Sequence, residues 1–167
     1  MRVKRSCRHI ISSKDGRRSI YIDEANSEAI LSYINKDERH KKKFEYIAEI
    51  ILGGHRNSEL YDKEDINERC KDVTAMKFFK GQENDRIYCK EMTTPRGSRV
   101  VIASVLYLGK KSQQNSQREK STINCSYLYE NTWEIKKEIT PYILNNWNKD
   151  LLKREVSYFE RDNKYSN

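Results

Sequence analysis

The sequence predicts an α+β fold in which a small twisted antiparallel sheet carries N-terminal helices on one face, with a helical extension towards the C-terminus. Two observations carry this prediction. One segment in the first third repeats apolar residues at helical spacing, and three later segments alternate residue types as strands do. The connections between those three segments are short, which favours an antiparallel meander. Helices, then antiparallel strands, then helices are typical of the α+β class.

The N-terminal segment is basic and contains a candidate hairpin. Residues 7–12 and 18–23 flank the turn at 14–16, which ends in glycine, and they are suited to pair as strands. Asn26 or Ser27 then caps a short amphipathic segment that includes Ile30 and Ile34. This first part, residues 1–35, is expected to be a basic segment with a hairpin and a short helix.

A longer helix is expected at residues 37–52. Its apolar positions are spaced by three and four residues, so they form one stripe; they are Phe44, Ile47, Ala48 and Ile51. The pair Gly53-Gly54 ends the helix, because glycine adopts the left-handed conformation that a helix C-terminus favours. The lysine run at 41–43 lies on this helix, and its simplest interpretation is a solvated face. Residues 55–72 are polar and are expected to form a loop with a helical turn.

Three strands are expected at 73–80, 86–92 and 99–108. In the second of them, Arg86, Tyr88 and Lys90 share one face, and Ile87, Cys89 and Glu91 share the other. The third strand is apolar on both faces, which predicts a central position. Its expected faces are Val100, Ile102, Leu106 and Leu108 against Val101, Ala103, Val105 and Tyr107.

Further helices are expected after the strands. A capping box begins at Ser116, and Thr140-Pro141 is suited to begin a last helix that carries an apolar stripe. The expected organisation is therefore a basic segment at 1–35, a core at 36–125 and a helical extension at 126–167.

Composition restricts the class of protein. The 167 residues include 33 Lys and Arg against 25 Asp and Glu, a formal charge of +8, which favours encounters with polyanions. No apolar run approaches the length that spans a bilayer, and no secretion signal is recognisable at the start. We therefore expect a cytoplasmic protein with reduced cysteines and no membrane partner. Cys7 and His9 are the only close Cys/His pair, so neither a metal nor a cofactor is expected.

The positive charge gathers around the expected sheet. Residues 73–120 contain ten basic and four acidic side chains. Interleaved tyrosines such as Tyr88 and Tyr107 offer rings on which a nucleic-acid base stacks. A basic face on an antiparallel sheet is also a common solvated face, so both interpretations stay open at this level.

Two segments, MKFFKGQENDRIYCK at 76–90 and RVVIASVLYLGKKSQ at 99–113, resemble the phage-derived HigB branch of the RelE toxin superfamily. The family has a strand, a glycine turn, an Arg-Ile-Tyr strand, a buried strand and a Lys-Lys-x-Gln step into a helix. The resemblance covers about residues 36–125, and the helix at 37–52 lies where the family has a helical hairpin. It implies a RelE-like fold and the toxin of a toxin–antitoxin pair. Such a toxin is a metal-independent endoribonuclease that cuts mRNA, typically on the ribosome, and a small antitoxin protein silences it.

The resemblance also implies roles for individual residues. Arg86 would clamp the scissile phosphate, Tyr88 would act as base or stacking platform, and three lysines would stabilise charge. The candidate catalytic set is Arg86, Tyr88, Lys77, Lys80 and Lys110, and the candidate RNA-binding set is Lys90, Arg96, Arg99, Tyr107 and Lys111. His55 is a further acid–base candidate, because histidine exchanges protons near neutral pH.

The chain departs from the family at both ends and in the polar stretch that follows Lys111. Two other functions therefore stay open. One is a non-catalytic nucleic-acid-binding or adaptor module on the same scaffold. The other is a protein-interaction domain whose basic face meets an acidic partner.

Overall fold

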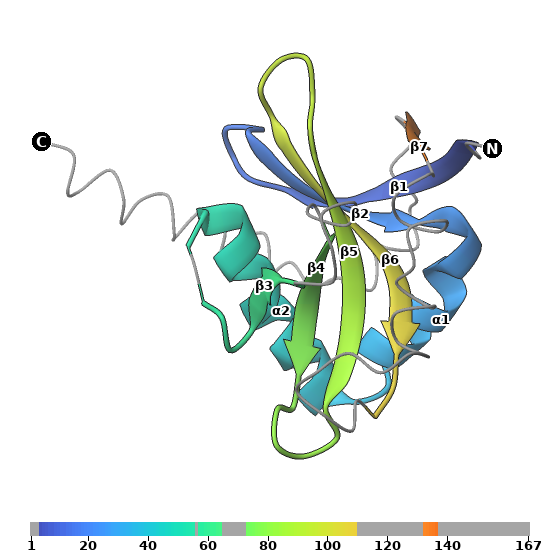
Figure 1. Cartoon of the computed structure of the whole chain (residues 1–167), viewed down its shortest axis with the longest axis vertical. Coiled ribbons are helices and arrows are strands. Elements are labelled where there is room, and N and C mark those ends of the chain that lie inside the picture. The colour runs from blue at the N-terminus through green and yellow to red at the C-terminus, as the bar shows by residue number, and fades with distance from the viewer. Residues whose placement is uncertain (1–3, 56, 65–72, 110–131, 137–167) are drawn as a thin grey trace, which may run out of the picture.

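The structure, a computed structural model, describes residues 4–55, 57–64, 73–109 and, for the backbone only, 132–136. Its fold is α+β, with two helices and an open, mostly antiparallel sheet (Figure 1). The strands are β1 (Lys4–Ser12), β2 (Arg18–Asp23), β3 (Tyr61–Lys63), β4 (Val73–Phe78), β5 (Asp85–Thr93), β6 (Arg99–Tyr107) and β7 (Thr132–Lys136).

Strands β1–β6 form the sheet in the order β3-β4-β5-β6-β2-β1, and β7 lies along the outer edge of β1. Neighbours are antiparallel except at two joints, β2 with β6 and β1 with β7. The three strands predicted at 73–80, 86–92 and 99–108 are confirmed as β4, β5 and β6, and the predicted N-terminal hairpin is confirmed as β1–β2. Because β2 pairs with β6, this hairpin belongs to the same sheet as the meander.

Two helices follow β2, after a short 3-10 turn at Glu24–Asn26. They are α1 (Ser27–Ile34) and α2 (Glu38–Gly53). The side chain of Asp37 caps α2 by accepting from the backbone N–H of His40 at 2.8 Å. Gly54 ends the helix in the left-handed conformation with φ 68°. The predicted apolar stripe of this helix is confirmed as buried against the sheet.

Two apolar clusters cover the two faces of the sheet. The larger joins both helices to Ile20, Ile22, Ile87 and Cys89 on one face. The smaller lies on the opposite face around Tyr88; its buried members are Cys7, Val73, Ala75, Tyr88, Val100 and Ile102. The second face is therefore apolar and buried around Tyr88, rather than the solvated basic face that the alternation in the second strand suggested.

The predicted faces of β6 are wrong beyond Ser104, because the strand contains a β-bulge there. Tyr88 pairs with Val105 and Cys89 with Ala103, so Ser104 is an extra residue. The extra residue inverts the alternation that follows it. Leu106 consequently packs with the helix-side cluster, and Tyr107 packs with the opposite cluster. The amide of Asn26 donates to the backbone oxygen of Ser104 at 2.7 Å and holds the bulge.

Some predictions fall outside the described residues. These are the helices expected from Ser116 and Pro141 and most of the helical extension at 126–167. Within that extension the backbone at Thr132–Lys136 forms strand β7. In the segment predicted as loop, Tyr61–Lys63 forms the edge strand β3. Among the described residues, no helix is both long and apolar enough to cross a bilayer.

Candidate functional site

Arg86 and Tyr88, the clamp and base that the resemblance implies, both lie on the sheet face turned away from the helices. Arg86 Nη1 is 3.3 Å from Glu64 Oε1, and the two side chains are only 12% and 8% exposed. Tyr88 has no exposed surface, and its ring lies 6.2 Å from that of Tyr107. As folded here, neither side chain is open to a nucleic acid.

The two strand lysines lie beside the edge of the sheet. Lys77 Nζ donates to the backbone oxygen of Ser58 at 2.8 Å, and Lys80 Nζ donates to both carboxylate oxygens of Glu59 at 2.9 Å. Burial lowers the pKa of Lys77, and the neighbouring Arg86 guanidinium lowers it further. A lowered pKa suits a base, but the ammonium of Lys77 already donates to the backbone oxygen of Ser58.

The other predicted RNA contacts are dispersed. Lys90 is half-buried on the face opposite the helices, and Arg96 is exposed on the β5–β6 turn. Lys110 and Lys111 lie outside the described residues. Arg99 is exposed at the start of β6, on the helix side of the sheet. The structure therefore does not gather the predicted set into one site.

We expect Arg86→Met to destabilise the protein rather than act on RNA directly. It leaves the buried Glu64 carboxylate without this cation, which costs about 3 kcal/mol of the free energy of unfolding. Urea denaturation measures this loss. The matched change Arg96→Met, at an exposed arginine, should cost less than about 0.5 kcal/mol. Equal stability of the two variants would show that the Arg86–Glu64 pair contributes nothing.

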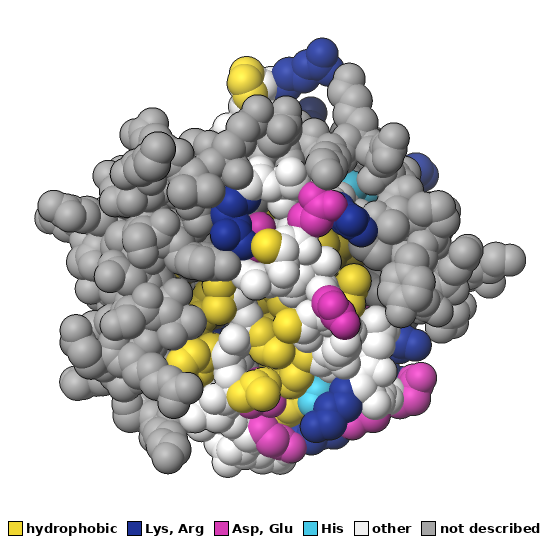
Figure 2. Space-filling model, turned by 90° about the vertical axis from the view of Figure 1, so that its right-hand side faces the viewer, with side chains coloured by type: hydrophobic (Ala, Val, Ile, Leu, Met, Phe, Trp, Pro, Cys, Tyr) yellow, Lys and Arg dark blue, Asp and Glu magenta, His cyan; other side chains and the backbone are white. Residues whose placement is uncertain are grey.

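The surface at α1 and the N-terminal hairpin is not a basic patch in its described part. Figure 2 shows Lys and Arg side chains beside Asp and Glu, with hydrophobic side chains between them. The ion pairs on these elements match that picture. Arg5 Nη2 lies 2.5 Å from Asp23 Oδ2, and Arg8 Nη2 lies 2.6 Å from Glu24 Oε1.

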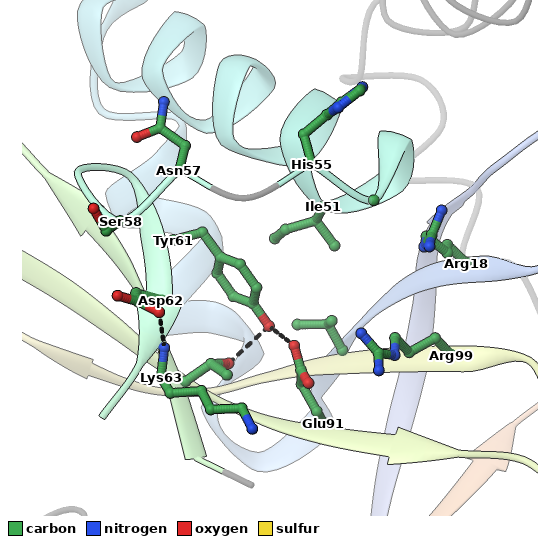
Figure 3. Close-up of a pocket in the computed structure, with 13 residues that line it drawn as sticks. Arg18, Ile51, His55, Asn57, Ser58, Tyr61, Asp62, Lys63, Glu91 and Arg99 are labelled. Carbon is green, nitrogen blue, oxygen red and sulfur yellow. Dashed lines mark hydrogen bonds between the residues drawn. The ribbon is translucent and has the colours of Figure 1, made fainter. Parts of the chain in front are cut away.

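A cavity of about 510 Å³ lies on the helix side of the sheet (Figure 3). The C-terminal end of α2 and the loop after it form one wall. The short strand β3 forms another, and the floor comes from β2, β4, β5 and β6. Its polar lining includes Arg18, Arg99, His55, Tyr61, Lys63 and Glu91. Of these, the sequence singled out Arg99 and His55 as functional.

Two arginines lie side by side at one end of this cavity. Arg18 begins β2, Arg99 begins β6, and the two residues are direct partners in the parallel pairing of these strands. Like charges directly opposite on neighbouring strands repel each other. Within the described part of the chain, no ion pair joins either guanidinium to a carboxylate. Such a pair is suited to an anion that bridges both cations.

Gly54 holds Arg18 in place. A Cβ atom added at Gly54 would overlap the guanidinium of Arg18, so this side chain packs directly against the backbone where α2 ends. Cations are stabilised near a helix C-terminus by the partial negative charge of the last carbonyl groups. The glycine thus ends the helix and leaves room for the cation.

We expect Gly54→Ala to weaken anion binding beyond its effect on stability. The left-handed φ of 68° costs about 1 kcal/mol for an L side chain, and the new methyl group displaces Arg18. Gly81→Ala is the matched control, since its φ is 78° and no atom lies within 4 Å of an added Cβ. Thermal unfolding should shift similarly in both variants, whereas RNA affinity should fall only for Gly54→Ala. A similar affinity loss in both would contradict the role given to Gly54.

A carboxylate lies opposite the arginines. Tyr61 donates its hydroxyl proton to Glu91 Oε1 at 2.6 Å and accepts from the hydroxyl of Thr74 at 2.8 Å. Burial, followed by the nearby Cys89 and Glu91, raises the pKa of Tyr61 far above its ordinary value. Tyr61 therefore stays protonated and orients the Glu91 carboxylate. In Figure 3 the guanidinium of Arg99 points towards Glu91 across the cavity.

His55 and Lys63 lie at the rim. The ring of His55 points away from the Tyr61–Glu91 pair in Figure 3, and Lys63 extends from β3 on the other side. Among the described residues, no group of three or more His, Cys, Asp or Glu side chains is arranged to hold a metal ion. The described lining thus offers the two arginines for a phosphate and the Glu91 carboxylate, fixed by Tyr61, for a proton.

No family model matches the chain, and comparison with curated proteins and with solved structures found no match.

Proposed function

We propose that this protein binds RNA in the cavity between α2 and the sheet and cleaves its backbone without a metal. The observation that carries the proposal is the pairing of Arg18 with Arg99 beside the Tyr61-held carboxylate of Glu91. Two arginines at paired positions of neighbouring strands are suited to bind the non-bridging oxygens of one phosphate. A carboxylate fixed nearby is suited to accept a proton from a neighbouring hydroxyl.

The reaction that these groups would support starts at the ribose 2′-hydroxyl. Glu91 removes its proton while the 2′-oxygen attacks the adjacent phosphorus, and the bond from phosphorus to the 5′-oxygen breaks. Arg18 and Arg99 stabilise the negative charge that develops on the phosphorane. The leaving 5′-oxygen takes a proton from water, or from His55 once its ring turns inward. The products are a 2′,3′-cyclic phosphate and a 5′-hydroxyl.

The resemblance to RelE and HigB toxins points to the same reaction class, and the order of elements supports it. A helical hairpin, α1–α2, precedes the antiparallel meander β4–β5–β6. On this proposal the fold is RelE-like, mRNA on the ribosome is a candidate substrate, and a small antitoxin protein is the partner. The site, however, is placed on the helix side of the sheet rather than around Arg86.

One observation favours the non-catalytic alternative. The His55 ring points away from the carboxylate, so the described cavity does not direct this histidine at the leaving oxygen. A module that only holds RNA through Arg18 and Arg99 needs no such group. Binding without cleavage is therefore the second candidate function.

The test incubates the purified full chain with single-stranded RNA, with and without ribosomes, in EDTA. We expect cuts that leave a 2′,3′-cyclic phosphate. DNA of the same sequence should be bound but not cut, because it lacks the 2′-hydroxyl. Binding without any cut would select the non-catalytic module. Cleavage that requires magnesium and leaves a 5′-phosphate would exclude the proposed mechanism.

A further inference from the structure

A second hollow of about 680 Å³, here called the α2 groove, lies beside the first half of α2. It is lined by five cations and one carboxylate, the latter being Glu59. The cations are Arg39, Lys42, Lys43, Lys77 and Lys80. Among the lining residues, Tyr46 has 54% of its surface exposed, so its ring is accessible to a ligand.

The helix side of this groove is a single stripe. Lys42, Lys43 and Tyr46 lie three, four and seven residues after Arg39, so the four side chains share one face of α2. The apolar stripe that includes Phe44 and Ile47 lies elsewhere on the helix, against the sheet. Of the lysine run at 41–43, Lys42 and Lys43 share this hollow with Tyr46, whereas Lys41 does not line it.

The cations of the groove differ in their present partners. Arg39 stacks over the Phe79 ring, with its guanidinium carbon 3.6 Å from the ring centroid, and it binds Glu83 at 2.7 Å. Lys80 binds Glu59. Lys42 and Lys43 have no ion pair within the described part of the chain. The Lys43 ammonium lies 5.8 Å from the centroid of the Phe79 ring, and neither lysine is held by a carboxylate of the described residues, so both can bind a new anion.

The groove adjoins the cavity that holds Arg18 and Arg99. One short loop separates them, since Asn57 and Ser58 line the cavity whereas Glu59 and Leu60 line the groove. Both hollows follow the same helix, with Lys43 beside one and Gly54 beside the other. These residues are eleven positions apart in α2 and its cap, which corresponds to about 16 Å along the axis. A short single-stranded segment can span that distance.

We propose that the α2 groove binds the single-stranded RNA that flanks the phosphate held by Arg18 and Arg99. Lys42 and Lys43 contact backbone phosphates, and Tyr46 stacks on an unpaired base. Exposed aromatic rings interleaved with cations recognise single strands, because a base in a duplex is already stacked. This inference rests on the proposed function, since it assigns the groove to the same substrate.

The test compares two ligands by fluorescence anisotropy, using the full-length chain. One is a single-stranded RNA about ten nucleotides long, within the range of single-strand sites, and the other is a dinucleoside monophosphate that fills only the cavity. Combined Lys42→Ala and Lys43→Ala should weaken the long RNA about tenfold. The combined change should also reduce the slope of log K against log salt by about 1.4. Tyr46→Leu should weaken the long RNA by about tenfold with little change in salt slope.

The affinity of these variants for the dinucleoside monophosphate should not change. Lys36 is exposed and lines neither hollow, so Lys36→Ala should leave the affinities for both ligands unchanged. Equal affinity of wild-type protein for the long and short ligands would overturn the inference and leave cleavage at the cavity intact. The single change Arg99→Ala tests the proposed function separately, because it should weaken the binding of both the long RNA and the dinucleoside monophosphate. Competition by polyglutamate as strong as by RNA would also overturn the inference, since it would indicate an acidic protein partner.

Discussion

Arg99→Ala should lower the rate of RNA cleavage by about a hundredfold to a thousandfold, the usual effect of removing one preorganised group that stabilises an oxyanion. On the proposed mechanism, Arg99 shares the developing phosphorane charge with Arg18, its partner across β2 and β6. Single-turnover cleavage of a labelled single-stranded RNA measures the effect.

The same variant should keep or slightly gain stability. Arg99 is exposed and lies directly opposite another arginine, so its removal relieves a repulsion of about 0.2–1 kcal/mol. Arg96→Ala is the matched control, because Arg96 is equally basic and exposed but lies on the β5–β6 turn. A cleavage rate lowered equally by both variants would mean that only the general positive charge matters. A destabilised Arg99→Ala would mean that the pair is structural.

A stable like-charge pair is itself informative. In sequences that fold well, local preferences and contacts agree with the overall fold, and unfavourable local contacts concentrate at functional sites. Asp15, in the β1–β2 turn, pairs with Arg17 and accepts from Ser13, and the nearby Arg18 cation also helps to lower the pKa of its carboxyl group. Asp15 forms no direct ion pair with Arg18 or Arg99 within the described residues, so both guanidinium groups are still suited to an external anion.

The local elements could be predicted because short-range patterns determine them. The stripe through Phe44 and Ile51 predicted α2, and Gly54 predicted its end. The alternation from Arg86 to Glu91 predicted β5 and its two faces. Each of these features depends on residues within one or two turns or on a single strand, which sequence displays directly.

The candidate site could not be predicted because it depends on the pairing of two strands that are far apart in the sequence, β2 and β6. Arg18 meets Arg99 only because β2 pairs with β6 in parallel, and the two residues are 81 positions apart in the sequence. The sequence offered no sign of this pairing, so the N-terminal hairpin was interpreted as an addition to the core. Arg99 was identified as an RNA contact, but its neighbours Arg18 and Glu91 were not.

Burial of the second face was the other unpredicted feature. Alternation showed that Arg86 and Tyr88 share a face, but not that Val100, Ile102 and Cys7 would surround that face with apolar surface. The bulge at Ser104 also escaped prediction, because a single extra residue leaves no mark on an apolar strand. The apolar cluster on this face buries Tyr88 and leaves Arg86 only 12% exposed, the two residues that the family resemblance implied as base and phosphate clamp.

The Tyr61–Glu91 pair distinguishes cleavage from simple binding. We expect Glu91→Gln to lower the cleavage rate by about a hundredfold to ten-thousandfold, since the variant lacks the base for the 2′-hydroxyl. The amide oxygen can still accept from Tyr61, so the fold of the cavity should persist. RNA affinity should stay equal or increase, because one negative charge beside the bound phosphate has gone. Rate and affinity measured on the same RNA separate these two effects.

Asp62→Asn is the matched control for this prediction. Asp62 lines the same cavity, and the change removes the same charge, but its carboxylate accepts from the backbone N–H of Lys63 rather than from Tyr61. Asp62→Asn should therefore raise RNA affinity slightly without slowing cleavage. If Glu91→Gln cuts as fast as the wild type, Glu91 is not the base. If it binds more tightly and the wild type itself does not cut, the cavity holds RNA without chemistry, as the non-catalytic alternative requires.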